Sequence, residues 1–313
     1  MKAFPQPIPR IARAALVVPA LVVLAATLML ARAAVPPGAK VLVVNSDASV
    51  AKYVEVQTAF KETLGADGVT EVDLAQVGEA GVRRALAENP GLIYCIGRNA
   101  YQTTKKLAKG KPIVMSTVIN WEAFKPIPAT TRVIANELPA GQQLTLFRQF
   151  FPKLQRVGVI YNPASNKQWF AQAVLAGKEV GVEVIGHTVT RSSQVAAELG
   201  KLAPKVDALW LVSDPMVLEN ETAVLTYFAR ANAAKKPVFT YSPAFTELGA
   251  TLVIAPDMPT IGRQAAGVAQ DHAGAPAVST PAGSEVTLNL KRVQQYGLEF
   301  NREALDSVNN LIR

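Results

Sequence analysis

The chain has few of the side chains that bind transition metals or act as catalytic nucleophiles: one cysteine and two histidines among 313 residues. It has no H-E-x-x-H motif and no C-x-x-C pair, so no metal site is predicted. It also lacks a G-x-S-x-G elbow, a G-x-G-x-x-G after a strand, and a P-loop lysine. We therefore predict that the protein is not an enzyme and has no cofactor. The single cysteine, Cys95, excludes an intrachain disulfide, and its apolar surroundings predict burial rather than reactivity.

Long charge runs are also absent, and half of the residues are apolar, which excludes global disorder and allows two domains with buried cores. The formal charge of +8 comes from 32 basic and 24 acidic side chains. Four of the basic ones lie in the first 33 residues, which contain no acid, so the remainder carries 28 basic side chains and a net charge of +4. This mild excess does not predict a nucleic-acid partner.

The N-terminus has the pattern of an export signal. Three basic side chains in the first thirteen residues precede an apolar run from Ala14 to Leu30 and the small residues Ala31 and Ala33. This predicts a cleavable signal peptide over residues 1–34 and a periplasmic or other extracytoplasmic location. The alternative is an uncleaved membrane anchor, because a run of 17 apolar residues approaches spanning length. No cysteine lies near the cut, so a lipid-anchored protein is not expected.

From Lys40 onward, short apolar runs alternate with longer amphipathic segments. The runs are too short for helices and rich in β-branched residues, so they predict buried strands. These strands are expected at 40–45, 69–74, 92–96, 112–117, 132–135, 156–161, 183–189, 208–212, 237–239 and 251–254. Helices are expected at 49–64, 77–88, 100–107, 140–151, 165–176, 195–202, 216–234 and 258–272. Strand and helix in strict alternation predict an α/β fold with parallel sheets covered on both faces.

The two halves of the chain resemble each other. KVLVVNSDAS at 40–49 aligns with RVGVIYNPAS at 156–165, and each is followed by a helix and a new strand. This predicts two doubly wound parallel-sheet lobes joined by a hinge. Any two βαβ units look alike to some degree, so chance similarity is the alternative, but it leaves the fold class unchanged. Ligands of such open sheets bind beyond the carboxyl ends of the strands.

Polar residues follow the predicted strands in both lobes, and we expect them to face one cleft. Short loops also need such residues to turn and to cap helices, as Ser49 and Ser165 are placed to do, so each one taken alone has two explanations. An arginine such as Arg98 can pair with a ligand carboxylate through two hydrogen bonds, the alternative being a solvated loop arginine. The candidate ligand-binding residues are Asn45, Ser46, Asp47, Gly97, Arg98, Ser116, Thr117, Asn120, Asn162, Ser165, Asp214, Tyr241 and Ser242.

Several segments together resemble one family of transport proteins. They include LIYCIGRNAYQ at 92–102, RVGVIYNPAS at 156–165, KVDALWLVSDPMV at 205–217 and ELGATLVIAPDMPTIGRQAAGVA at 247–269. Their order is similar to that of the ABC-transporter substrate-binding family that includes tryptophan- and tyrosine-binding proteins. The resemblance covers roughly Lys40 to Arg302.

The resemblance implies the type I periplasmic binding-protein fold, in which the chain crosses between the lobes three times. We expect these crossings near Leu138, Gly249 and Pro281. The implied first lobe comprises residues 39–138 and 250–281, and the second comprises 139–249 and 282–313.

The resemblance also implies the function: a monomeric clamp that captures a small molecule and presents it to the membrane permease of an ABC importer. The sequence departs from the family at Gly97-Arg98-Asn99-Ala100, where Gly-Thr-Pro-Ala is usual, and after Asp214, where Asn-Thr is usual. We therefore expect only the class of the ligand, which is an amino acid or a related small polar or aromatic compound. Two alternatives remain: a sensory module that signals to a membrane receptor, and a secreted enzyme using Asp214 or Asp47.

Overall fold

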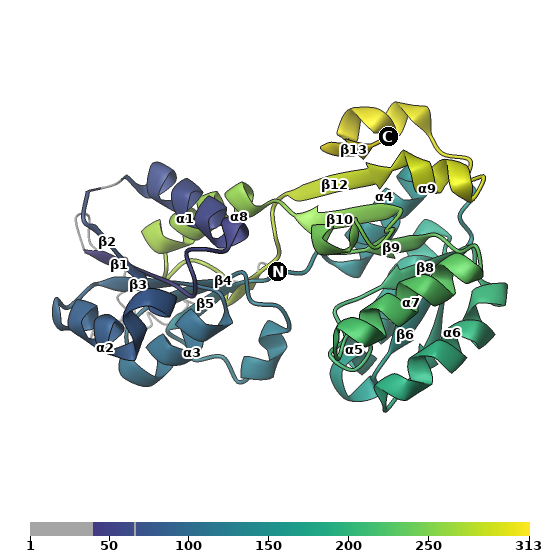
Figure 1. Ribbon diagram of the computed structural model, residues 1–313. Helices are drawn as coiled ribbons and strands as arrows, with labels where there is room; N and C mark the ends of the chain where they lie inside the picture. The colour runs from purple at the N-terminus through teal and green to yellow at the C-terminus, as the bar shows by residue number, and fades with distance from the viewer. Residues whose placement is uncertain (1–39, 66) are drawn as a thin grey trace, which may run out of the picture. The chain divides into compact units, whose positions relative to one another are not determined.

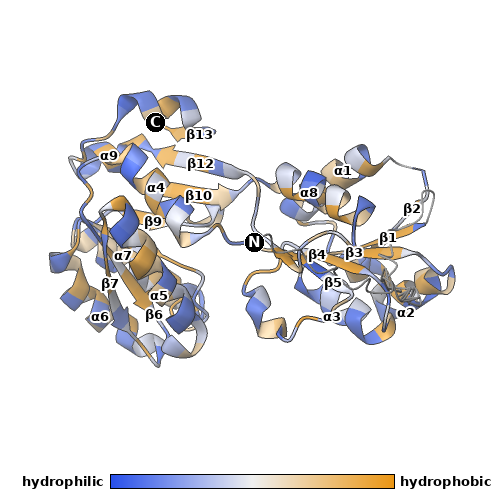
Figure 2. Ribbon diagram, turned by 180° about the vertical axis from the view of Figure 1, so that it is seen from behind, coloured by the Kyte–Doolittle hydropathy of each residue, from blue (hydrophilic) through white to orange (hydrophobic). Residues whose placement is uncertain are grey.

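The computed structural model describes residues 40–65 and 67–313 (Figure 1), and the predicted signal peptide lies outside these ranges. Two mostly parallel sheets, each covered by helices, make up the described chain, which confirms the predicted α/β class. Figure 2 shows hydrophobic strands between helices whose outer faces carry the hydrophilic residues. None of the helices in the described ranges has the length and hydrophobicity needed to cross a membrane.

The first sheet has the strand order β11-β5-β4-β3-β1-β2, with every pair parallel. Its strands are β1 (Val41–Asn45), β2 (Val69–Asp73), β3 (Leu92–Ile96), β4 (Ile113–Ser116), β5 (Thr131–Ile134) and β11 (Val278–Ser279). Strands β1 and β3 are buried along their whole length. Their alternate residues pack on opposite faces, as the period of a strand requires: Val43 and Tyr94 on one side, Val44 and Cys95 on the other.

One face of this sheet is covered by α1 (Ala51–Leu64) and α8 (Met258–Gln270), and the other by α2 (Leu74–Ala87) and α3 (Arg98–Leu107) (Figure 1). Helices α1 and α8 lie unusually close together. A Cβ atom added to Gly262 would lie 2.3 Å from the carbonyl oxygen of Val56. Glycine at this position therefore lets the late segment of the chain dock against the first helix.

The second sheet has the order β13-β12-β10-β9-β8-β6-β7, parallel except for the antiparallel pair β10–β12. Its strands are β6 (Arg156–Tyr161), β7 (Glu183–Thr188), β8 (Ala208–Leu211), β9 (Val238–Thr240), β10 (Leu252–Pro256), β12 (Ser284–Asn289) and β13 (Asn310–Ile312). Its helices are α4 (Ala140–Phe150), α5 (Pro163–Val180), α6 (Val195–Leu202), α7 (Glu221–Ala233) and α9 (Leu290–Gln295). The 3₁₀ helices of the described chain are η1 (Trp121–Phe124), η2 (Ser192–Gln194), η3 (Ala203–Lys205), η4 (Pro243–Phe245) and η5 (Arg302–Ser307).

An aromatic cluster forms the core on one side of the second sheet. The ring of Phe147 from α4 meets Trp210 of β8 edge-on at 5.3 Å and Phe239 of β9 at 4.9 Å. Trp169 of α5 contacts Trp210 from a third direction at 4.9 Å. Aromatic pairs at these distances add to the stabilisation from burial, so the cluster fixes α4 and α5 on the sheet.

The chain passes between the two sheets at residues 135–139, after Pro256, and at residues 280–283. The crossing expected near Gly249 is therefore misplaced. Strand β10 pairs with β9 and β12, so Leu252–Pro256 belongs to the second sheet, and the chain leaves that sheet only at Asp257. The apolar run of β10 looks the same whichever sheet it joins, because it is buried on both faces.

Two other expectations differ from the structure. Strands β11, β12 and β13 were not predicted, and the helix expected at 216–234 begins only at Glu221. The Asn220 side chain accepts a hydrogen bond from the backbone nitrogen of Ala223 at 2.9 Å and so caps the helix. Residues before it form a turn around Asp214.

Candidate functional site

Three of the predicted loops meet at the carboxyl edge of the first sheet. Strands β1, β3 and β4 are neighbours, and backbone hydrogen bonds continue their pairing into the loops. The amide of Ser46 donates to the carbonyl of Ile96, and the amide of Gly97 donates to the carbonyl of Ser116, each at 3.0 Å. Ser46, Gly97 and Ser116 are thus brought together as expected from the parallel topology.

Ser46 and Gly97 shape this edge. The Ser46 hydroxyl accepts a hydrogen bond from the backbone nitrogen of Ala100 at 2.9 Å and caps α3. Gly97 has a φ of 86°, and a Cβ atom there would lie 2.7 Å from the Ser46 hydroxyl oxygen. Both residues therefore hold α3 against β1, and the Ser46 hydroxyl is already engaged.

Ser116 is fully buried and its hydroxyl lies 2.7 Å from that of Tyr94. The Tyr94 ring in turn stacks on Phe60 at 4.4 Å. The hydroxyl of Ser116 therefore faces the core beneath α1, which fits a structural role.

The loop after β1 is closed by its own side chains. Asn45 donates to Gln57 at 2.8 Å and accepts from the amide of Asp47 at 3.0 Å. Asp47 accepts from both the amide and the hydroxyl of Ser49, at 2.9 and 2.6 Å, and these bonds lower the pKa of its carboxyl. The prediction that Ser49 caps α1 is wrong: Val50 is the N-cap residue, without a side-chain hydrogen bond, because Ser49 is turned toward Asp47.

The loop after β4 carries two non-glycine residues in the left-handed region. The φ angles of Thr117 and Asn120 are 57° and 54°. This conformation is tolerated by asparagine but strained for a β-branched residue. Such strain concentrates at ligand-binding and catalytic sites, where the surrounding structure enforces it.

Arg98 lies against the same loop. Its guanidinium donates to the carbonyl oxygen of Ile119 at 3.1 Å and lies 4.9 Å from the centre of the Phe124 ring. None of the ion pairs found in residues 40–65 and 67–313 includes Arg98. The side chain is thus positioned by one hydrogen bond and one ring, with donors left over.

Glu137, which was not among the predicted residues, approaches this loop from its other side. Its Oε1 atom accepts a hydrogen bond from the backbone nitrogen of Asn120 at 2.7 Å. Burial raises the pKa of the carboxyl to about 7, outweighing the lowering effect of the Asn120 bond, and the nearby Glu122 raises it further. The signal for it was present, because Glu137 follows the fifth strand as the other candidates follow theirs.

In the second lobe, Asp214 joins two strand ends. Its Oδ2 atom accepts from the backbone nitrogen of Asn162 and the side-chain amide of Asn166, both at 2.7 Å. Its Oδ1 atom accepts from the amides of Met216 and Val217, at 2.9 and 3.1 Å. The side chain is 1% exposed, so a carboxylate with four donors is sealed beneath the surface. Asn166 also went unrecognised, since it lies inside a helix.

The other predicted residues of this lobe occupy the same edge. Asn162 caps α5 by accepting from the amide of Ala164 at 2.8 Å, so Ser165 lies in the first turn, exposed, rather than opening the helix. Tyr241 packs edge-on against Phe245 at 5.7 Å, and burial raises the pKa of its hydroxyl. Ser242 starts η4 with a long 3.4 Å hydrogen bond to the amide of Ala244.

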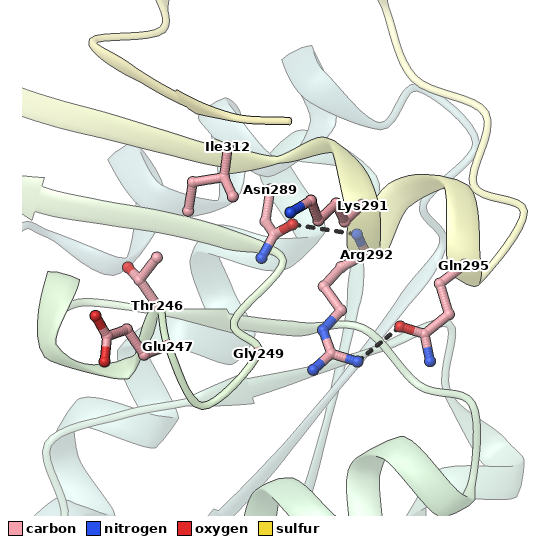
Figure 3. A pocket seen from close by; sticks show the side chains of 8 residues that line it. All are labelled: Thr246, Glu247, Gly249, Asn289, Lys291, Arg292, Gln295 and Ile312. Carbon is pink, nitrogen blue, oxygen red and sulfur yellow. Dashed lines mark hydrogen bonds between the residues drawn. The ribbon is translucent and has the colours of Figure 1, made fainter.

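A pocket of about 540 Å³ lies at the opposite edge of the second sheet, where β10 begins and β12 ends (Figure 3). None of the predicted site residues lines it. The Arg292 guanidinium crosses it and is held by Gln295 at 2.6 Å and by Asn232 at 3.3 Å. These contacts anchor α9 on the lobe. The lining residues are Thr246, Glu247, Gly249, Asn289, Lys291, Arg292, Gln295 and Ile312.

The strand-end loops of the described chain offer hydrogen bonds and charge. Within the described residues, no cluster of three or more His, Cys, Asp or Glu side chains could hold a metal ion. The Nδ1 atom of His187 on β7 lies 2.9 Å from the Oε2 atom of Glu198 on α6. The Nε2 atom of His272 lies 3.2 Å from the carbonyl oxygen of Ile113. Neither contact involves a predicted loop residue.

Comparison with known sequences supplies the family. The family described as "ABC transporter substrate binding protein" matches residues 38–310 of the chain. The chain belongs to this family. Members are solute-binding proteins that act outside the cytoplasm and are not enzymes, so the enzyme alternative is set aside.

Among relatives of this substrate-binding protein is a tyrosine-binding protein of Clostridioides difficile (strain R20291), 24% identical over 194 residues. The match spans 58% of this chain and about half, 54%, of that relative. The function of the whole relative therefore does not transfer directly.

Solved structures confirm the fold of the substrate-binding protein. A ligand-free, open substrate-binding protein with adhesive properties from Clostridium difficile is 17% identical, with a TM-score of 0.69 over 88% of this chain and 99% of that one. An ABC domain in complex with L-Trp from Streptococcus pneumonia is 19% identical, with a TM-score of 0.56 over 87% and 100%. The predicted type I binding-protein fold is thus confirmed.

Proposed function

We propose that this protein is exported by a cleavable signal peptide, captures a small molecule between the strand-end loops of its two lobes, and delivers it as a monomer to the permease of an ABC importer. The match to the substrate-binding family over residues 38–310 carries this proposal. The grouping of Arg98, Thr117 and Asn120 at one sheet edge, and of Tyr241 and Ser242 at the other, supports it.

The proposed ligand is an amino acid or a related small polar or aromatic compound. One protein similar to this chain is a tyrosine-binding protein, and another was solved in complex with L-Trp, which favours this ligand class. Arg98 suits a carboxylate, because a guanidinium offers paired donors to its two oxygens. Tyr241 offers a flat wall for an apolar or aromatic group.

The proposed mechanism is a clamp. The ligand first contacts the loops of one lobe, and the closed form is then favoured by the contacts that the second lobe adds. The closed form is the one that docks on the permease. Small-angle scattering with and without a bound ligand tests closure, and identical dimensions in both states would refute it.

The binding role is tested by thermal unfolding of the purified protein, freed of ligand by denaturation and refolding. The panel contains amino acids, aromatic acids, peptides and nucleosides. A ligand at one hundred times its Kd adds about 2.7 kcal/mol, a shift of several degrees. Arg98→Ala should reduce the shift, whereas Lys109→Ala, an exposed residue after α3, should not. If no compound shifts the midpoint, the proposed ligand class is wrong.

A further inference from the structure

Glu137 lies among the residues of the candidate site, and the part of the chain that the structure describes gives it no partner of opposite charge. It follows β5, which pairs with β4, so it shares the carboxyl edge of the sheet with Arg98 and Asn120. Arg98 binds the carbonyl of Ile119, and Glu137 binds the amide of Asn120, so the two side chains hold consecutive residues of one loop. The edge therefore presents both a guanidinium and a carboxyl next to the same strained loop.

The carboxyl of Glu137 is only partly engaged. It accepts a hydrogen bond from the backbone nitrogen of Asn120 at Oε1, and hydrogen bonds from the backbone amides of Asn136 and Glu137 also lower its pKa, but all of these donors are uncharged. No ion pair within residues 40–65 and 67–313 includes it. A carboxylate removed from water without a cation is costly even where backbone amides donate to it, and a cation beside the carboxylate would remove that cost.

The charged and titratable groups around Glu137 do not neutralise it. Glu122 on η1 is another acid and raises its pKa. Tyr241, after β9, is affected by the charge of Glu137, which contributes to raising the pKa of the tyrosine. Arg98 is directed at the carbonyl of Ile119. Among the described residues, Glu137 is therefore a largely buried acid without a counter-ion, and a cationic ligand would take that place.

We propose that Glu137 binds the cationic nitrogen of the ligand, so that the ligand is an amine-bearing small molecule. This inference rests on the proposed function. Together with Arg98, it makes this edge complementary to a zwitterion, with a cation for the carboxylate and an acid for the ammonium group. An exposed glutamate would already be ionised in the free protein. It would give the same specificity for an amine, but ligand binding would then release no proton.

Ligand binding is coupled to proton release because Glu137 is protonated in the ligand-free protein at acidic pH. Because burial raises the pKa of Glu137 to about 7, the free protein holds a proton there at pH 6. An ammonium group at the carboxylate favours the ionised form, so binding at pH 6 releases that proton. The affinity should therefore rise with pH and level off above the free pKa, with Kd about tenfold weaker at pH 6 than at pH 8.

The test is isothermal titration of the purified protein with L-tyrosine and L-tryptophan. Two matched probes accompany them: 3-(4-hydroxyphenyl)propionate, which lacks the amine, and tyramine, which lacks the carboxylate. Titrations at pH 6 in two buffers of different ionisation enthalpy give the number of protons released. The variants are Glu137→Gln, which keeps the acceptor for Asn120, the conservative Glu137→Asp, and the control Glu122→Gln, an exposed neighbouring acid.

We expect close to one proton released by the wild type, somewhat less by Glu122→Gln because the charge of Glu122 raises the pKa of Glu137, and none by Glu137→Gln. Glu137→Gln should also weaken amino-acid binding at pH 8 by ten- to a hundredfold and bind the amine-free probe as well as the amino acid. Glu137→Asp should restore part of the proton release.

Two failures are distinguishable. If the wild type binds the amine-free probe as tightly as L-tyrosine, or releases no proton, the proposal for Glu137 is overturned while the binding role stands. If none of the four probes nor any other amine in the panel binds at millimolar concentration, the proposed ligand class is refuted and the role of Glu137 with it. Thermal unfolding of each variant confirms that it is folded.

Discussion

Asp214 is expected to be a structural residue of the second lobe rather than a ligand contact, and Asp214→Asn separates the two roles. Each carboxylate oxygen accepts two hydrogen bonds, one pair from Asn162 and Asn166 and the other from Met216 and Val217. An asparagine keeps one acceptor oxygen, so in either orientation its NH₂ group faces two donors. Two charge-assisted bonds are lost, each contributing about 1.5–3 kcal/mol. We expect a loss of about 4 kcal/mol in the free energy of unfolding.

Urea unfolding followed by tryptophan fluorescence measures this loss, because Trp169 and Trp210 lie in the core of the second lobe. The matched control is Asp207→Asn. Asp207 also accepts two backbone hydrogen bonds, from Gln155 and Arg156, but at a partly exposed position, so we expect a loss of less than about 1 kcal/mol. A stability change below about 1 kcal/mol for Asp214→Asn, with ligand affinity reduced more than tenfold, would refute the structural assignment.

Three further predictions concern the first lobe. Gly97→Ala should destabilise it by about 2–4 kcal/mol in urea unfolding, because φ is 86° and the new methyl group would meet the Ser46 hydroxyl; an unchanged midpoint would show that the loop relaxes freely. Tyr94→Phe should cost about 1–2 kcal/mol, since it leaves the buried Ser116 hydroxyl without its partner, and Tyr94→Phe combined with Ser116→Ala should recover part of that loss. Without ligand, the free energy of unfolding of Glu137→Gln should match that of the wild type near pH 4 and exceed it by about 2 kcal/mol at pH 8. The reason is that the raised pKa of Glu137 makes the wild type lose stability as the pH rises from about 4.5 to 7. Parallel curves of stability against pH for the two proteins would contradict the raised pKa.

The strands of both sheets could be predicted from local sequence where burial is complete. The run at 92–96 and the run at 156–161 coincide with β3 and β6, because a short β-branched segment bounded by polar residues has few other ways to bury itself. Strand β12 could not be found this way. It pairs antiparallel with β10 after the chain has returned from the first sheet, so its position depends on a distant segment and not on its own alternation.

The grouping of the candidate residues was predictable, whereas the contacts that each side chain makes were not. The rule that ligands meet the carboxyl ends of parallel strands places the candidates at the carboxyl edges of the two sheets, and the structure has them there. It does not show which hydroxyls the protein uses itself. Ser116 faces Tyr94 because it lies two residues after Val114 on the same face of β4, and the two hydroxyls meet because of the register between β3 and β4, which no local pattern encodes.

Burial separates residues that hold the loops from residues that remain free to recognise a ligand. Ser46, Ser116 and Asp214 are nearly inaccessible, and every one has a partner in the chain, as buried polar groups require. Arg98 and Glu137 are half-buried, and each has one side-chain hydrogen bond to the backbone of the loop after β4.

Replacing either half-buried residue removes a single bond to that loop, whereas replacing Asp214 disturbs four hydrogen bonds at two strand ends. Ligand preference can therefore change at Arg98 and Glu137 while the strand-end scaffold stays intact. This division of roles agrees with the sequence, in which Asp214 matches the family pattern and the Gly97-Arg98-Asn99 segment departs from it. We therefore expect Asp214 to support the loops and the segment that departs from the family pattern to contact the ligand.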